Sequence, residues 1–327
     1  MKQAAVGIAL MAGMLTASGQ TAVNRLERAW LFGHDYVRLS DWARIYNLDV
    51  SRSPGSKEVR LTSRWSRLVF TVDSRKSELN GAIVHLTVPV AARGSVVYIA
   101  YSDVIKVVQP ILIKPDPAGQ PPIRRVCLDP GHGGRDTGGG SGRHREKEYT
   151  LLLAREVKSQ LTKAGLQVVL TRGEDKFVAL PERPEYARRN NADLFVSLHF
   201  NSTQSGADQA QGVEVYCLTP AGASSTNARS DETDSNAYRG NRFDFDNLLL
   251  AYHIQKSMVA NLRMEDRGVK HARFAVLREA AMPAVLVEAG FLSHPPESRN
   301  IINPEYRRKL ATAIVDGILA YKDRVGQ

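Results

Sequence analysis

Histidines and carboxylates stand at the ends of several expected strands, where together they could form a hydrolytic metal site. His132 lies in the glycine-rich run CLDPGHGGRDTGGG (127–140), His199 directly follows Leu198 in SLHFNS, and Glu288 ends the run AVLVE. In an open α/β sheet, functional residues gather at the carboxyl ends of strands. Each residue alone is more often structural, but three at equivalent places in one sheet favour a shared site.

A second carboxylate is available at the start of an expected helix, in REKEYTLLLAREV. Glu146 or Glu148 begins this helix, where a negative charge also stabilises the helix dipole. The residues alone do not choose between the two glutamates, and they do not exclude a capping role. Two histidines and one carboxylate around an open position are the usual ligands of a hydrolytic zinc ion, with a further glutamate as general base.

The glycines around His132 do not complete a phosphate-binding motif. Asp136 stands where a dinucleotide fingerprint needs its third glycine, and GGGSGR lacks the G-K-[ST] ending of a P-loop. The absence of a G-x-S-x-G elbow disfavours a serine hydrolase. We also find no H-E-x-x-H pattern of a zinc peptidase, and H-x-x-E occurs only once, as HPPE at 294–297. A glycine-rich turn after a strand instead indicates close approach of the backbone to a site.

The elements that must position these residues alternate between apolar strands and amphipathic helices from residue 123 onward. Strands are expected at 125–129, 167–171, 194–198, 212–217 and 284–288. Helices are expected at 147–164, 183–190, 247–262 and 304–323. Near-continuous apolar strands such as LFVSL fit a sheet covered on both faces. This pattern predicts an α/β three-layer sandwich with one mostly parallel sheet flanked by helices.

The beginning of the chain has the features of an exported protein. Residues 1–19 combine a basic start with a short apolar run and small residues, which is typical of a signal peptide. No other stretch approaches membrane-spanning length, so we expect no integral membrane segment after cleavage. The formal net charge of +10 suits an anionic polymer such as the cell wall. Nucleic acid is disfavoured as a partner because no basic-aromatic motif accompanies the charge.

A smaller region precedes the α/β part. Residues 27–112 alternate in short apolar runs and predict a β-rich α+β domain, with short helices at 39–46 and 101–108. Residues 113–122 form a proline-rich linker. The region 27–112 resembles the copper amine oxidase N-terminal-like (stalk) domain. This resemblance implies no metal here, because the copper chemistry of that family belongs to a different domain.

The α/β part carries a more specific resemblance. DPGHGGRDTGG, EKEYTLLLA, ALPERPEYARRNNADLFVSLHFNS and DRGVKHARFAVLREAAMPAVLVEAGFLSH are similar, in this order, to the zinc-dependent N-acetylmuramoyl-L-alanine amidases of the amidase-3 type. The resemblance covers about residues 123–324. It implies a six-stranded sheet and one zinc ion per catalytic domain.

The same resemblance implies the reaction and the roles of the residues. Zinc-activated water cleaves the amide between N-acetylmuramic acid and the L-alanine of the peptidoglycan stem. The implied zinc ligands are His132, Glu146 and His199, so the resemblance selects Glu146 over Glu148. Glu288 is the implied catalytic carboxylate, which takes the proton of water and returns it to the leaving amine. Gly131 and Gly133 are expected to let the backbone turn tightly enough to aim His132 over the sheet edge.

Two further positions, Asn201 and Arg183, match the family, but each is as readily structural: a turn former and an ion-pair partner on its helix. The cysteines Cys127 and Cys217 fit a disulfide or two buried thiols. Leu218–Asp246 is rich in Ser, Asn, Asp and Gly and predicts a disordered surface loop; a lid over the cleft is the alternative.

Alternative functions are a catalytically silent wall-binding relative and a zinc peptidase acting on stem peptides. A silent relative would be expected to lack Glu288 or one of the ligands, but all four residues are present. A zinc peptidase would be expected to carry a motif such as H-E-x-x-H, which this sequence does not contain. We therefore expect an exported enzyme of the periplasm or cell envelope, with peptidoglycan as substrate and an envelope protein as regulator.

Overall fold

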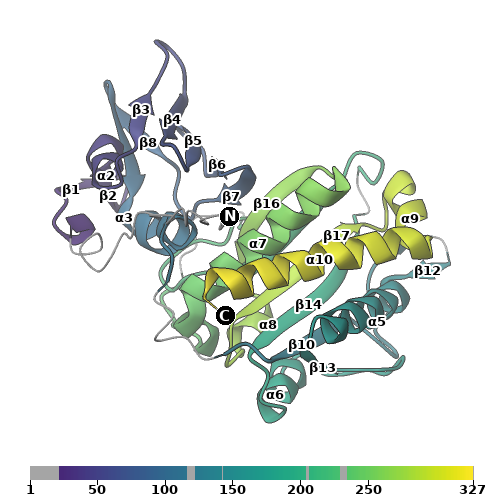
Figure 1. The fold of residues 1–327 in the computed structure, drawn as a ribbon. Helices are drawn as coiled ribbons and strands as arrows, with labels where there is room; N and C mark the ends of the chain where they lie inside the picture. The colour runs from purple at the N-terminus through teal and green to yellow at the C-terminus, as the bar shows by residue number, and fades with distance from the viewer. Residues whose placement is uncertain (1–21, 116–121, 142, 204–205, 229–233, 327) are drawn as a thin grey trace, which may run out of the picture.

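The computed structural model describes residues 22–115, 122–141, 143–203, 206–228 and 234–326 (Figure 1). The expected signal peptide, residues 1–19, lies outside this part of the chain, as do residues 116–121 of the proline-rich linker. Within the described ranges, no helix combines the length and the apolar composition needed to cross a bilayer.

Two groups of antiparallel strands make up the N-terminal region. One forms a four-stranded sheet of order β1-β2-β9-β8, from β1 (Arg28–Leu31), β2 (His34–Arg38), β8 (Ala91–Arg93) and β9 (Val96–Ala100). The other is a meander of β3 (Asp49–Ser51), β4 (Glu58–Thr62), β5 (Arg67–Thr71), β6 (Lys76–Leu79) and β7 (Ala82–His85). In β4, Val59 and Leu61 are buried while their neighbours Glu58 and Arg60 are exposed, as alternation along a half-buried strand requires.

Short helical segments complete this region. Helix α2 (Leu39–Ile45) lies where the apolar pattern predicts it. The second expected helix is longer than predicted: α3 (Tyr101–Asp103), the π-helical turn η1 (Val104–Val108) and α4 (Gln109–Leu112) follow one another without a break.

Six strands form the sheet of the α/β part, in the order β13-β10-β14-β17-β15-β16. They are β10 (Arg125–Pro130), β13 (Gln167–Leu170), β14 (Leu194–Asn201), β15 (Val213–Leu218), β16 (Asp266–Ala272) and β17 (Ala284–Phe291). The first four strands in this order are parallel, whereas β15 runs antiparallel to β17 and parallel to β16. A two-stranded ribbon of β11 (Gly140–Ser141) and β12 (His144–Arg145) precedes the first long helix.

Helices cover both faces of this sheet. The long helices α5 (Glu146–Lys163), α7 (Asp244–Leu262) and α10 (Pro304–Arg324) pack together on one face, and α9 (Pro295–Ile302) leads into α10 (Figure 1). The other face carries the shorter helices α6 (Glu182–Arg189) and α8 (Ala275–Arg278), with the 3₁₀ turn η3 (Arg239–Phe243) against α8. The covered faces explain the near-continuous apolar strands.

The sheet does not stop at its sixth strand, and here the expected architecture is only partly right. Strand β16, which the sequence did not predict, pairs in parallel with β7 through Val269 and Val84. Asp266 Oδ2 accepts a hydrogen bond from the backbone N–H of Ile83 at 2.8 Å. The N-terminal meander thereby extends the α/β sheet into one mixed sheet of eleven strands.

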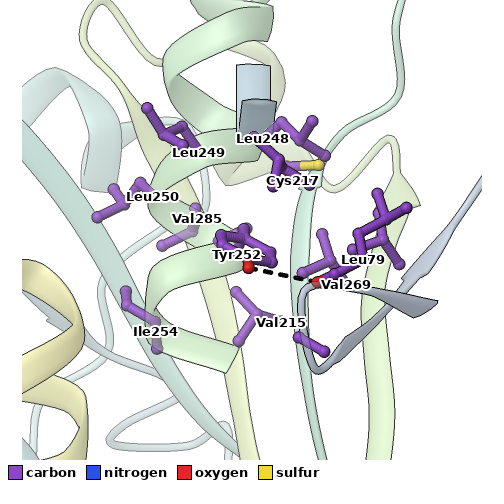
Figure 2. Packing of buried hydrophobic residues seen from close by; sticks show 14 of the residues in the cluster. Leu79, Val215, Cys217, Leu248, Leu249, Leu250, Tyr252, Ile254, Val269 and Val285 are labelled. Atoms are coloured by element: carbon purple, nitrogen blue, oxygen red, sulfur yellow. Dashed lines mark hydrogen bonds between the residues drawn. The ribbon is translucent and has the colours of Figure 1, made fainter. Parts of the chain in front are cut away.

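One hydrophobic core runs through both regions. Leu79 of the N-terminal meander is fully buried against α7 and the strands β15 and β16, and the Tyr252 hydroxyl donates to its carbonyl oxygen at 3.3 Å (Figure 2). Burial of such side chains contributes roughly 1.5–3 kcal/mol each. Packing as well as strand pairing therefore joins the two regions.

The segment Leu218–Asp246 is predicted to be a disordered loop, but its described residues make specific contacts with the rest of the chain. Thr226 exchanges backbone and side-chain hydrogen bonds with His271 of β16, and Asn227 Nδ2 donates to the Tyr216 hydroxyl at 3.0 Å. Ser224 is buried.

Both cysteines, Cys127 and Cys217, are buried free thiols, so the disulfide alternative is wrong.

Candidate metal centre

Three side chains from separate elements meet at the carboxyl edge of the central strands. His132 lies in the turn after β10, Glu146 is the first residue of α5, and His199 lies in β14. One potential ligand atom of each lies within 4.8 Å of the others. Glu146 is buried, whereas Glu148 of the same helical turn is exposed. The structure thus brings together the three residues that the family resemblance implied.

The Glu146 carboxylate lies between the two imidazoles. Its Oε2 is 3.1 Å from His132 Nε2, and its Oε1 is 2.9 Å from His199 Nδ1. Burial tends to raise the pKa of Glu146, but the hydrogen bonds and charges of the two histidines outweigh burial and lower it well below its usual range. Glu146 is therefore ionised at any pH at which the protein would act.

A second carboxylate orients His132. Asp136 Oδ2 lies 2.9 Å from His132 Nδ1, on the ring nitrogen that does not face Glu146. Burial acts to lower the pKa of His132, but Glu146 and Asp136 together raise it. A carboxylate on the far nitrogen fixes the tautomer and ring orientation of a metal-binding histidine. Sequence reasoning missed Asp136 in this role, although the spacing H-x-x-x-D was visible.

Two glycines leave the room that this cluster needs. A Cβ on Gly131 would lie 2.3 Å from His199 Cε1, and a Cβ on Gly138 would lie 2.5 Å from Glu146 Oε2. Gly131 therefore matters for the close approach of His199, and not only for the turn that aims His132.

Two buried arginines hold the glycine-rich turn in place. Arg172 donates to the carbonyl oxygens of Pro130 and Gly131 at 2.9 and 2.8 Å. Arg183 pairs with Asp129 of β10 at 2.9 Å and donates to the His132 carbonyl at 3.0 Å. His132 itself has a left-handed backbone with φ of 60°, which is unfavourable for a non-glycine residue. Arg183, on helix α6, is thus an ion-pair partner as expected, and the residue that it pairs with is Asp129 of β10.

Glu288 lies beside the cluster on the neighbouring strand. It pairs in register with His199 on one side and with Glu214 on the other. Burial, then the charges of Glu146 and Glu214, raise the pKa of Glu288 well above its usual range, and Lys270 opposes them. Its Oε2 is buried and has no hydrogen-bond partner among the described residues. An orphaned carboxyl oxygen next to three potential ligands is suited to proton transfer.

Both β14 and β17 run further than the sequence predicted. β14 ends at Asn201 and β17 at Phe291, so His199 and Glu288 lie within their strands and not at the last residues. Asn201 is not simply a turn former, because its Nδ2 donates to Glu214 Oε1 at 3.0 Å. Glu214 is a buried carboxylate that sequence reasoning did not identify, since a single Glu in the apolar run VEVYCL carries no motif.

The donor set fits a zinc ion. Two imidazole nitrogens and one carboxylate are the protein ligands of many hydrolytic zinc sites. In such sites a second carboxylate often accepts a hydrogen bond from a ligating histidine and orients its ring, as Asp136 does for His132. The close His–Glu contacts and the space kept by the glycines agree with three ligands that converge on one point.

Comparisons with known proteins point the same way. Residues 126–320 match the Amidase_3 family model, described as N-acetylmuramoyl-L-alanine amidase. The amidase AmiA of Escherichia coli is 34% identical over 221 residues, which cover 61% of this chain and 76% of AmiA. The crystal structure of an N-acetylmuramoyl-L-alanine amidase from Clostridium difficile 630 is 33% identical with a TM-score of 0.51, and covers 62% of this chain and 98% of that one. AmiC2 of Nostoc punctiforme is 34% identical with a TM-score of 0.51, and covers the same shares.

Proposed function

This chain belongs to the N-acetylmuramoyl-L-alanine amidase family, and from that premise we propose that its catalytic centre is a zinc ion held by His132, Glu146 and His199. The chain is a peptidoglycan hydrolase that cleaves the amide between N-acetylmuramic acid and the L-alanine of the stem peptide. The observation that carries the zinc proposal is the convergence of these three side chains beside Glu288.

Bound zinc supplies a Lewis acid that lowers the pKa of water and polarises a carbonyl oxygen. The protein's own residues orient the ligands and hold the turn that carries His132 in place. Glu146 remains ionised and the Asp136 carboxylate holds the His132 ring, so both are oriented before substrate arrives. The buried arginines Arg172 and Arg183 keep the turn that carries His132 in its left-handed conformation.

Glu288 is the proposed proton carrier. An amide needs a proton removed from water and a proton delivered to the leaving nitrogen, and one carboxyl group can do both in turn. Its raised pKa keeps a proton available for the nitrogen of L-alanine, while a cation bound beside it would favour the ionised form that accepts the proton of water.

We also propose the division of the chain into a signal peptide (1–19), a stalk-like domain (27–112), a linker (113–122) and the catalytic part (123–324). Export to the periplasm or cell envelope is supported by relatives such as a probable cell wall amidase of Staphylococcus epidermidis. Regulation by an envelope protein, with Leu218–Asp246 as a gate, stays a prediction.

Digestion of purified peptidoglycan followed by mass analysis tests the proposal. We expect intact stem peptides released from glycan, loss of activity with a chelator, and recovery with added zinc. His132→Ala and His199→Ala should lose both zinc and activity, whereas His34→Ala, in β2, should lose neither. Shortened stem peptides would identify a peptidase, binding without hydrolysis would identify a silent relative, and full zinc content in both ligand variants would reject the metal centre.

A further inference from the structure

A guanidinium group lies at the same edge of the sheet as the metal cluster but comes from a different part of the chain. Strands β15 and β16 run opposite to β17, so their first residues lie at the edge where β14 and β17 end. Arg267 is the second residue of β16. One strand, β15, lies between it and Glu288, so two strand spacings place its backbone about 10 Å away.

Direct contacts connect Arg267 to the catalytic strands. Its Nε donates to Glu214 Oε2 at 2.8 Å, and Glu214 is the register partner of Glu288. Its guanidinium carbon lies 4.8 Å from the centroid of the Phe291 ring, at the end of β17. The carboxylate that holds Arg267 also accepts a hydrogen bond from Asn201, two residues after His199.

Arg267 is one of two cations beside Glu214, and the two differ in exposure. Glu214 accepts from both Arg267 and Lys270, so one carboxylate faces two cations. Lys270 is buried, whereas the Arg267 side chain is 29% exposed. Of these two cations, Arg267 is therefore the one that is presented to solvent. Its Nη1 reaches the Gln211 carbonyl at 3.3 Å, and within the described ranges Nη2 has no hydrogen-bond partner.

We propose that Arg267 binds a carboxylate of the stem peptide and thereby selects the substrate, an inference that rests on the amidase function proposed above. A guanidinium held on one side by a carboxylate and stacked on an aromatic ring is preorganised, and it recognises carboxylates through paired hydrogen bonds. The ligand is the free α-carboxylate of the glutamyl residue that follows L-alanine.

The distances agree with this ligand. An extended peptide advances at most about 3.3–3.6 Å per residue. From an amide cleaved beside Glu288, the residue after L-alanine thus reaches well into the ~10 Å gap to β16, and the long arginine side chain spans the remainder. A stem peptide that crosses β15 toward β16 brings its first carboxylate to Arg267.

The test compares two muropeptides as competitors of peptidoglycan hydrolysis. Both are N-acetylmuramoyl-L-alanyl-D-glutamate with the γ-carboxyl capped as the methylamide; one keeps the α-carboxylate, and the other carries a carboxamide there. For the wild-type holoenzyme, we expect the carboxylate to inhibit about 10- to 100-fold more strongly, the range of a charge-assisted hydrogen bond. The Arg267→Ala enzyme should be inhibited equally by both muropeptides, because the guanidinium that favours the α-carboxylate is gone.

Two further variants separate recognition from stability. Arg267→Gln keeps a polar side chain beside Glu214 and should also lose the discrimination, even if the alanine variant folds poorly. Arg273→Ala removes a positive charge at the opposite end of β16 and should discriminate as the wild type does. If both muropeptides inhibit the wild type equally, or if neither inhibits it, the inference about Arg267 is wrong. Hydrolysis of the polymer in the same preparation would still support the amidase function. Failure to hydrolyse the polymer would instead reject the proposed function.

Discussion

The space above Gly131 gives the sharpest test of the cluster's geometry. In Gly131→Ala, the new Cβ would lie 2.3, 2.5 and 2.6 Å from three ring atoms of His199, where ordinary contacts begin near 3.4 Å. The ring must therefore move by about 1 Å. The backbone does not resist the change, because Gly131 is not among the glycines with positive φ.

The consequence should be large for activity and small for folding. The His199 ring is held by Glu146 at 2.9 Å, so displacing it disturbs two of the three proposed ligands at once. A misplacement of about 1 Å at a reacting centre can reduce the rate by ~10²-fold. Overpacking of this kind usually costs about 1–3 kcal/mol of stability. The carbonyl oxygen of residue 131 still accepts from Thr150 and Arg172, so the turn should keep its shape.

Zinc content, melting temperature and peptidoglycan turnover measured on one preparation provide the assay. Gly173→Ala is the matched control, because its Cβ would meet no atom within 4 Å and its φ is not positive. The control should match the wild type in all three measurements. Wild-type zinc content and turnover in Gly131→Ala would refute the idea that this glycine makes room for a ligand.

Three other predictions follow from the site and its surroundings. Glu288→Gln keeps the size of the side chain but cannot carry a proton, so turnover should fall by ~10²–10⁴-fold with zinc content unchanged; wild-type turnover would exclude the proton-transfer role. Asp136→Ala frees His132 Nδ1, so zinc affinity measured against a chelating dye should fall about 10- to 100-fold, and unchanged affinity would make Asp136 dispensable. Burial lowers the pKa of His271 to about 4, so the unfolded chain binds more protons between pH ~6.5 and ~4. Urea titrations should show stability falling by up to about 3 kcal/mol as pH drops through this window, and less in His271→Gln; an equal fall in both would contradict the assignment.

The placing of His132, His199 and Glu288 toward the carboxyl ends of neighbouring strands was predictable, because a buried strand followed by a polar residue is visible in the sequence. The continuation of β14 and β17 past His199 and Glu288 was not. Resemblance was needed to choose Glu146, since Glu148 lies in the same helical turn and only packing buries one of them. Arg172 and Glu214 could not be identified, because they act through contacts with residues distant in sequence, such as the Pro130 and Gly131 carbonyls for Arg172 and Lys270 for Glu214.

Strand β16 was missed for a related reason. Its sequence DRGVKHA has charged residues at Asp266, Arg267 and Lys270 and a glycine at Gly268, so it offers neither an apolar run nor clean alternation. These charged side chains contact residues distant in sequence: Arg267 and Lys270 share Glu214, and Asp266 accepts from the backbone of Ile83. The described part of Leu218–Asp246 is ordered by similar contacts, which composition does not encode.

The pairing of β7 with β16 also determines the order in which the molecule can be completed. β7 ends at His85 and β16 begins at Asp266, so roughly 180 residues are synthesised between the two halves of one ladder. Contacts of such high sequence separation form late, because loop-closure entropy opposes them. Until then β7 is an open edge, and the apolar side chains of Val84 in β7 and Leu79 in the adjacent β6 are uncovered, which is a template for misassociation between nascent chains. The N-terminal region therefore depends on the catalytic part to cover its edge strand. When it is produced alone, it should self-associate through β7, and adding the catalytic part in trans should prevent this.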